Sequence, residues 1–148
     1  DYAGQFAHNF YLYMHDGIFR MTPWDMNEGF LQTQAFYRES DGARQDITTP
    51  LTGGETLESR PLVGILSVPE YYDKYLEYCE ILSKWLDGLD QKLPALRERI
   101  RADVENDPTA FFSYQDFERQ FDSSYSNGLA GYILERSAYL NERLAELY

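Results

Sequence analysis

The fold is decided by residues 9–27, which read NFYLYMHDGIFRMTPWDMN. Two runs of β-forming residues, 9–14 and 18–22, flank an Asp-Gly pair at 16–17. An Asp-Gly pair between such runs favours a two-residue hairpin turn, which sets Met14 opposite Phe19 and Leu12 opposite Met21. This register gathers the apolar side chains on one face, and that consistency supports it. The apolar face holds Phe10, Leu12, Met14, Phe19 and Met21, and the other face holds Tyr11, Tyr13, Arg20 and Thr22.

Polar residues at the open end of this hairpin are candidates for chemistry. Asn9 precedes the first strand, and Asp25 and Asn27 follow the second, which should end at Pro23 because proline cannot donate a ladder hydrogen bond. The ends of an antiparallel hairpin meet, so we expect Asn9 near Asp25, although Asn9 itself faces Trp24 and the direction of Asp25 stays open. Carboxylate and carboxamide oxygens are hard donors that suit Mg²⁺ or Mn²⁺ when substrate phosphates supply the other ligands.

The rest of the chain predicts a loop followed by helices. Residues 38–60 are polar and contain several Gly, Thr and Ser, whereas 61–148 show helical periodicity. We therefore expect an α+β, mainly α-helical chain, with a hairpin zone at 1–27, a long loop and about five helices in a single unit. The expected helix starts are near Ser67, Asp90, Asp107, Ser113 and Asn127. The expected buried stripes are Tyr72, Tyr75, Cys79, Leu82 and Leu86; Leu93, Leu96, Ile100 and Val104; and Leu129, Ile133, Leu140, Leu144 and Leu147.

Charge and composition exclude several classes of protein. The 148 residues carry 13 Lys and Arg against 25 Asp and Glu, a formal net charge of −12. No basic cluster is present to bind a nucleic acid backbone, and a phosphorylated ligand would need a divalent cation beside it. No apolar run approaches the roughly 18–20 residues of a membrane helix. Cys79 is the single cysteine, which excludes an intrachain disulfide framework and a cysteine zinc site but leaves the compartment open.

Short motifs spread along the chain carry a family resemblance. They are His8-Asn-Phe-Tyr-Leu-Tyr13, Asp16-Gly17, Pro23-Trp-Asp25-Met-Asn27, Arg60-Pro-Leu-Val63, Val68-Pro-Glu-Tyr-Tyr-Asp-Lys-Tyr75 and Ile133-Leu-Glu-Arg136. Together they resemble the CotH family of spore-coat kinase-like proteins over nearly the whole chain. The resemblance implies the C-terminal lobe of an atypical protein kinase. Such an enzyme uses ATP with Mg²⁺ or Mn²⁺ to phosphorylate Ser on coat or surface proteins, at the spore coat or cell surface.

The resemblance also implies roles for particular residues. By position, Asp1 matches the catalytic Asp, Asn9 the cofactor-binding Asn near the metal, and Asp25 the metal-binding Asp. Asn27 stands where the family usually has a second metal-binding Asp, which lowers the local negative charge by one. The ATP-gripping lysine and the Gly-rich strands of the N-terminal lobe are expected upstream of Asp1, so the 148 residues alone are expected to be an inactive fragment.

A second class of function stays open beside the kinase. The chain could be a non-catalytic surface module that binds or scaffolds through its aromatic hairpin and its tyrosine-rich helix. Each site residue likewise has a structural interpretation. Asp25 could cap the turn after Trp24, Asn9 could be a turn residue before a strand, and Asp1 could be a solvated residue at the chain end.

Overall fold

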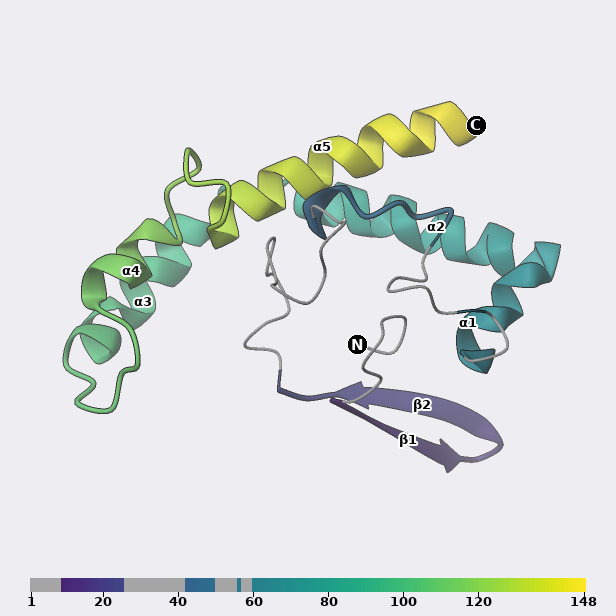
Figure 1. The fold of residues 1–148 in the computed structure, drawn as a ribbon, viewed down its shortest axis with the longest axis horizontal. Helices are drawn as coiled ribbons and strands as arrows, with labels where there is room; N and C mark the ends of the chain where they lie inside the picture. The colour runs from purple at the N-terminus through teal and green to yellow at the C-terminus, as the bar shows by residue number, and fades with distance from the viewer. Residues whose placement is uncertain (1–8, 26–41, 50–55, 57–59) are drawn as a thin grey trace. The chain divides into compact units, whose positions relative to one another are not determined.

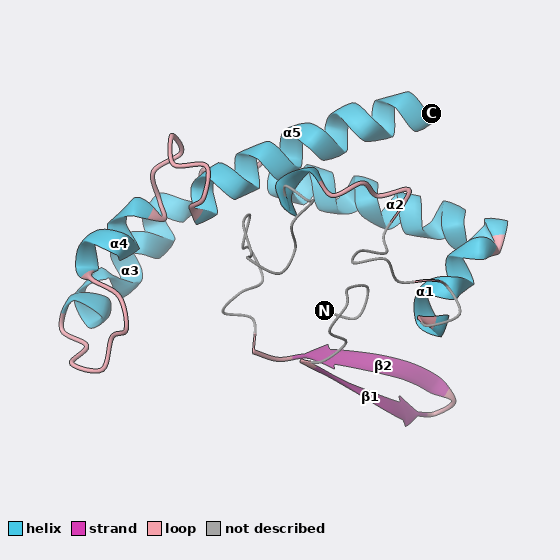
Figure 2. Cartoon of the chain, viewed as in Figure 1, coloured by secondary structure: helices cyan, strands magenta, loops and turns pink. Residues whose placement is uncertain are grey.

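The computed structural model describes residues 9–25, 42–49, 56 and 60–148 (Figure 1). In this part of the chain it is an α+β, mainly helical protein with a two-stranded antiparallel sheet and five α-helices (Figure 2). The elements are, in order, β1 (Phe10–His15), β2 (Ile18–Pro23), the 3₁₀ helix η2 (Gly42–Arg44), α1 (Pro61–Gly64), the 3₁₀ helix η3 (Ile65–Ser67), α2 (Pro69–Leu86), α3 (Leu93–Glu105), α4 (Tyr114–Arg119) and α5 (Leu129–Leu147). None of the helices described is long and apolar enough to cross a membrane.

The contacts divide the chain into two compact units. The first contains Asp1–Gly29 and Asp46–Tyr75, and the second contains Phe30–Gln45 and Leu76–Tyr148. The hairpin therefore belongs to the first unit. The second unit holds α3, α4, α5 and the C-terminal half of α2, so its helices can be described as one packed body.

The hairpin has the predicted register. Met14 pairs with Phe19, and β2 ends at Pro23. Asp16 and Gly17 form the turn with φ of 52° and 75°. Positive φ at both central residues is what a type I′ turn needs, and Asp and Gly tolerate it better than other residues. The local sequence alone thus accounts for this element.

Side-chain capping sets the start of α4 but not every helix start that the sequence predicts. Ser113 caps α4 with a capping box: its hydroxyl accepts from the Asp116 N–H at 3.1 Å, and Asp116 accepts from the Ser113 N–H at 3.0 Å. The helix expected to start near Asp90 begins at Leu93, and its N-cap is Lys92, which has no side-chain cap. The predicted helix start at Asp107 is wrong. Asp107 instead accepts from the Thr109 N–H at 2.8 Å in a local turn.

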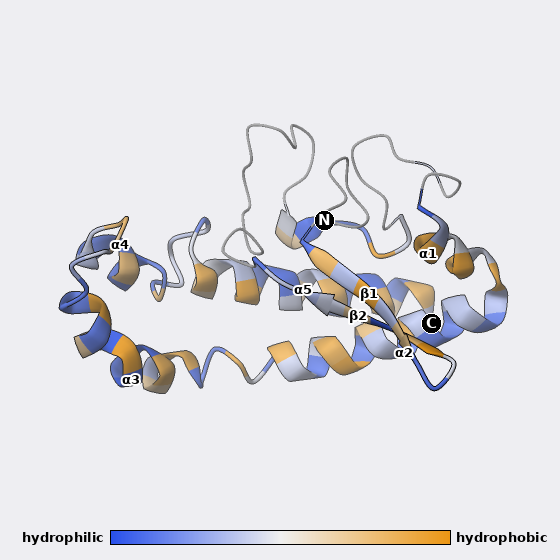
Figure 3. Cartoon of the chain, turned by 90° about the horizontal axis from the view of Figure 1, so that it is seen from below, coloured by the Kyte–Doolittle hydropathy of each residue, from blue (hydrophilic) through white to orange (hydrophobic). Residues whose placement is uncertain are grey.

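The core of the second unit lies where α5 meets α2 and the start of α3. Apolar and polar residues alternate along these helices (Figure 3). The α2 and α5 helices each bury one stripe, whereas α3 buries Leu93 at its start. The stripes differ in part from the predicted ones, because Leu82 and Leu96 are about half exposed while small residues of α5 are buried. The buried residues of this unit include Ala43, Leu76, Cys79, Ser83, Leu86, Leu93, Ala130, Gly131, Ile133, Ser137, Leu140 and Leu144.

A polar network joins α2 to α5 at the edge of this core, where buried Ser83 and Ser137 meet exposed Asp87 and Asn141. The Ser83 hydroxyl donates to Oδ1 of Asn141 at 2.6 Å, and Nδ2 of Asn141 donates to Oδ1 of Asp87 at 3.1 Å. Ser137 donates to the same oxygen of Asp87. Ser83 and Ser137 are buried, and both find partners, as buried hydroxyls must if the core is to be stable.

The α5 helix also holds part of the predicted loop at 38–60. Nη1 of Arg136 donates to the carbonyl oxygens of Ala43 and Gln45 at 3.2 and 2.6 Å. Arg44 lies over the Tyr139 ring, 5.4 Å from its centre. This segment is therefore a short 3₁₀ helix docked on α5. The other residues of the predicted loop that the structure describes carry no helix or strand.

Candidate functional site

The open end of the hairpin brings together the two sequence segments that carry the predicted site. Trp24 N–H donates to the carbonyl oxygen of Asn9 at 2.9 Å, one step beyond the strand register, so Asn9 faces Trp24 as predicted. The Trp24 ring also stacks on Tyr11, with centres 6.1 Å apart and planes at 25°. These two contacts hold the chain at Trp24 and thereby place the backbone of Asp25 at the mouth of the hairpin, beside that of Asn9.

The backbone is left-handed at Asn9 and Asp25, the two predicted site residues that the structure describes. Asn9 has φ of 62° and Asp25 has φ of 56°. Among the described non-glycine residues, the only other positive φ is at Asp16 in the turn. Asn and Asp are the non-glycine residues that adopt this conformation most readily, and single residues held there often mark functional sites. The left-handed residues Asn9 and Asp25 thus lie just outside the two ends of the β1–β2 pairing, at the open end of the hairpin.

The chemistry of this donor set fits a hard divalent cation. Asn9 offers a carboxamide oxygen and is half-buried, while Asp25 offers a carboxylate and is exposed. Oxygen donors of this kind suit Mg²⁺, which keeps several waters and takes only one or two carboxylates from the protein. In the described part of the chain, no group of three or more His, Cys, Asp or Glu side chains could hold a metal ion. A site built on Asp25 and Asn9 therefore depends on phosphate oxygens and water for its other ligands.

Two of the predicted site residues, Asp1 and Asn27, lie outside the described residues. The structure therefore brings together Asn9 and the segment of Asp25, and their roles remain predictions. Sequence reasoning missed the left-handed backbone at these positions and the stacking of Trp24 on Tyr11. The residue types gave a usable signal for the first, because Asn and Asp next to strand ends are common reversal points.

A second feature that sequence reasoning missed is an ion pair between α3 and α4 in the helical unit. Nε of Arg97 donates to Oε2 of Glu118 at 2.8 Å, and the Tyr114 hydroxyl donates to Oε1 of the same carboxylate. The hydrogen bonds from Arg97 and then from Tyr114 lower the pKa of Glu118 and keep it ionised. This ion pair joins α4 to α3, and the Glu118 carboxylate accepts hydrogen bonds from both Arg97 and Tyr114, so we assign it a structural role.

The described residues define a mainly helical α+β protein whose β-hairpin carries an asparagine and an aspartate at its open end. A family model described as CotH kinase protein matches residues 1–140. The chain belongs to the CotH kinase family, as its sequence motifs predicted. No curated protein and no solved structure matches the chain.

Proposed function

We propose that this chain is the C-terminal lobe of a kinase that transfers the γ-phosphoryl group of ATP to a Ser hydroxyl of a coat or surface protein. The observation that carries the proposal is the hydrogen bond at the open end of the hairpin, where the Trp24 N–H donates to the Asn9 carbonyl oxygen at 2.9 Å. It supports a shared site because it unites two segments that the family resemblance links to metal and nucleotide. Membership of the CotH kinase family supports the reaction class.

In this proposal the oxygens of Asp25 and Asn9 hold a Mg²⁺ or Mn²⁺ ion on the phosphates of ATP, and Asn27 adds a further contact. The ion would neutralise charge on the transferring group and align the phosphates. Net charge supports this role, because a chain at −12 repels ATP unless a cation lies between its carboxylates and the phosphates. The exposure of Asp25 is compatible with a ligand that also contacts bulk water.

Asp1 is the proposed catalytic residue. Its carboxylate would orient the Ser hydroxyl and accept its proton while the Ser oxygen bonds to the γ-phosphorus and the bond from that phosphorus to the ADP oxygen breaks. The lysine that grips ATP in this proposal comes from residues outside 1–148. The 148 residues alone are therefore expected to transfer no phosphate.

The test is phosphotransfer by the protein that carries this chain, with a Ser-containing coat or surface protein as acceptor and Mg²⁺ or Mn²⁺ present. Asp25→Asn removes the charge and keeps a residue that tolerates the φ of 56°. We expect kcat/KM to fall by about 100-fold or more, the typical loss for a group that stabilises transferring charge.

The control is Asp16→Asn, which makes the same change at a left-handed position in the turn of the same hairpin, where φ is 52°. We expect this variant to keep its activity within about twofold, because the residue lies at the far end from the proposed site. Equal activity in Asp25→Asn and wild type, or absence of phosphotransfer in the wild type with either metal, would refute the proposal.

The second candidate is a non-catalytic surface module. The observation that favours it is the exposure of aromatic side chains on the hairpin, with Tyr11 at 64% and Phe19 at 69%. Large exposed aromatic residues are common at binding surfaces. This candidate predicts binding to coat or surface proteins that Phe19→Ser weakens and Asp25→Asn leaves unchanged, in a protein without phosphotransfer.

A further inference from the structure

The α2 helix exposes a group of large apolar side chains beside the stripe that it buries. Four of them belong to the helical unit and are between 45% and 61% exposed. They are spaced at i, i+3, i+4 and i+7, so they lie together on one face of the helix. We call this group the α2 patch, and it consists of Tyr78, Ile81, Leu82 and Trp85.

The size of the α2 patch sets it apart from single apolar residues on a protein surface. An aromatic side chain contributes about 150–250 Å² when it is fully exposed, and an aliphatic one contributes somewhat less. With the exposed fractions of its four members, the patch therefore presents roughly 400 Å² of side-chain surface. Contiguous apolar patches of this size often mark interaction sites, and Tyr and Trp are enriched among the residues that carry binding energy.

Two residues of opposite charge border the α2 patch on the side away from the buried stripe. Glu77 directly precedes Tyr78 and Lys84 directly precedes Trp85, so the two charges lie seven residues apart along the same edge. Both side chains are exposed. Lys84 already donates to Oε1 of Glu80 at 2.6 Å, but this pair is exposed to solvent and the ammonium has three donors, so it can bind a second carboxylate.

The α2 patch and its charged edge match a second copy of themselves. Reversing the helix about its midpoint between residues 81 and 82 exchanges the positions of Tyr78 and Trp85, so the patch maps onto itself. In an antiparallel pair of helices, the charged edge of one lies along the charged edge of the other. Glu77 then faces the partner's Lys84, and the two-fold symmetry repeats this ion pair. A parallel pair would instead set the carboxylate of Glu77 against the apolar edge of the patch, where burial without a partner is costly.

We propose that two copies of this chain form a symmetric dimer in which the α2 patches pack face to face with the helices antiparallel. Tyr78 of each copy contacts the partner's Trp85, and Glu77 pairs with the partner's Lys84. With the charged edges included, the contact buries roughly 1,000 Å² in total, an area typical of weak and reversible interfaces. The proposal goes beyond phosphotransfer and does not rest on the site in the hairpin.

The test is sedimentation velocity of the 148-residue chain over a series of concentrations. The buffer holds about 0.15 M salt, in which the Debye length of about 8 Å screens most of the repulsion between two copies at −12 each. We expect a reversible monomer–dimer equilibrium with a dissociation constant in the micromolar range, as a small interface gives. A chain that stays monomeric up to about 1 mM would overturn the proposal, and the α2 patch would then belong to a partner with a different sequence.

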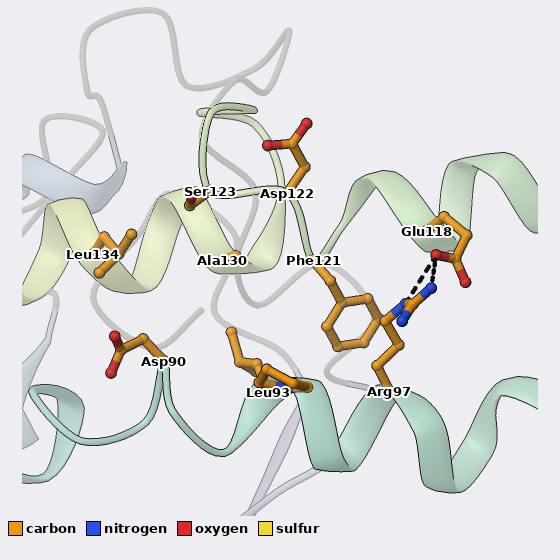
Figure 4. Close-up of a pocket in the computed structure, with 10 residues that line it drawn as sticks. Asp90, Leu93, Arg97, Glu118, Phe121, Asp122, Ser123, Ala130 and Leu134 are labelled. Carbon is orange, nitrogen blue, oxygen red and sulfur yellow. Dashed lines mark hydrogen bonds and ion pairs between the residues drawn. The ribbon is translucent and has the colours of Figure 1, made fainter.

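Paired serine substitutions test the apolar contact. Leu82→Ser removes a side chain beside the two-fold axis from both copies at once, so it should raise the dissociation constant by about tenfold or more. Leu96→Ser is the matched control, because Leu96 is 47% exposed and lies on α3 directly before Arg97, whose ion pair with Glu118 is drawn in Figure 4. It should leave the dissociation constant within about twofold of wild type. Equal weakening by the two variants, at equal helical content by circular dichroism, would overturn the proposal.

A charge-exchange experiment tests the antiparallel pairing. Lys84→Glu and Glu77→Lys each set like charges opposite one another, so each should weaken the dimer by about fivefold or more. Glu77→Lys also makes the chain less negative, so its expected effect is opposite in sign to that of net charge. The double variant restores both ion pairs in exchanged positions and should dimerise within about threefold of wild type. Stronger association of Glu77→Lys, or no recovery in the double variant, would overturn the proposal.

Discussion

Replacing Gly131 with alanine should destabilise the helical unit, although alanine is the better helix former. A Cβ at this position would lie 2.4 Å from the Tyr125 carbonyl oxygen and 2.9 Å from Cα of Ser126. The backbone would have to move by about 1 Å to restore an ordinary contact. That same carbonyl oxygen accepts the Gly128 N–H at 2.9 Å, so the movement also strains a hydrogen bond of the turn before α5.

The expected loss in the free energy of unfolding is the sum of three contributions. Overpacking costs about 1–3 kcal/mol, a weakened hydrogen bond adds about 1 kcal/mol, and alanine returns up to about 1 kcal/mol of helix propensity. The net loss of about 1–3 kcal/mol in the free energy of unfolding lowers the Tm of a chain of this size by about 2–10 °C.

The assay is thermal unfolding followed by circular dichroism, with Gly88→Ala as the matched control. A Cβ at Gly88 meets nothing within 4 Å, and its φ is not positive. The control should therefore be neutral or stabilising by up to about 1 kcal/mol. A Gly131→Ala protein that unfolds at or above the wild-type Tm would refute the close-packing argument.

Two further predictions concern the helical unit. Arg136→Leu removes the hydrogen bonds to the carbonyl of Ala43 in η2 and to that of Gln45 directly after it, so trypsin should cleave after Arg44 about tenfold faster or more; an unchanged rate would contradict the docking role of Arg136. The hydrogen bond from Arg97 lowers the pKa of Glu118, so the stability from this pair is complete above the ordinary glutamate pKa of about 4.3 and is lost as the pH falls through the lower pKa of the folded state. Between about pH 5 and pH 3 the Tm should fall more steeply in the wild type than in Glu118→Gln, and equal slopes would argue against that contribution.

The parts of the structure that could be predicted from the sequence rest on short-range chemistry. The hairpin register follows from Asp16 and Gly17 and from the alternation on either side, all within a few residues. The cap of α4 likewise depends on two residues three positions apart, Ser113 and Asp116. The meeting of Asn9 with Trp24 follows from the register, and through it the expectation that Asp25 lies nearby.

What could not be predicted depends on partners distant in the chain. Apolar periodicity locates a stripe on a helix, but the packing partner decides which edge of the stripe is buried, so Ser83 is buried and Leu82 is not. Small residues carry no such signal, and Gly131 is needed only because the chain at Tyr125 returns so closely. The anchoring of η2 by Arg136 spans more than 90 residues of sequence, which no local pattern reports.

The hydroxyl and amide contacts between α2 and α5 restrict how one helix can slide along the other. Apolar residues recur along the buried faces of both helices, so a shift of one helical turn, about 5.4 Å, would still bury apolar surface. It would separate Ser83 from Asn141 and Ser137 from Asp87, and Ser83 is too deeply buried for water to replace its partner. The α5 helix therefore has a single axial position relative to α2. Because Arg136 of α5 binds the η2 segment, the contacts of Ser83 and Ser137 that fix α5 also fix the position of η2.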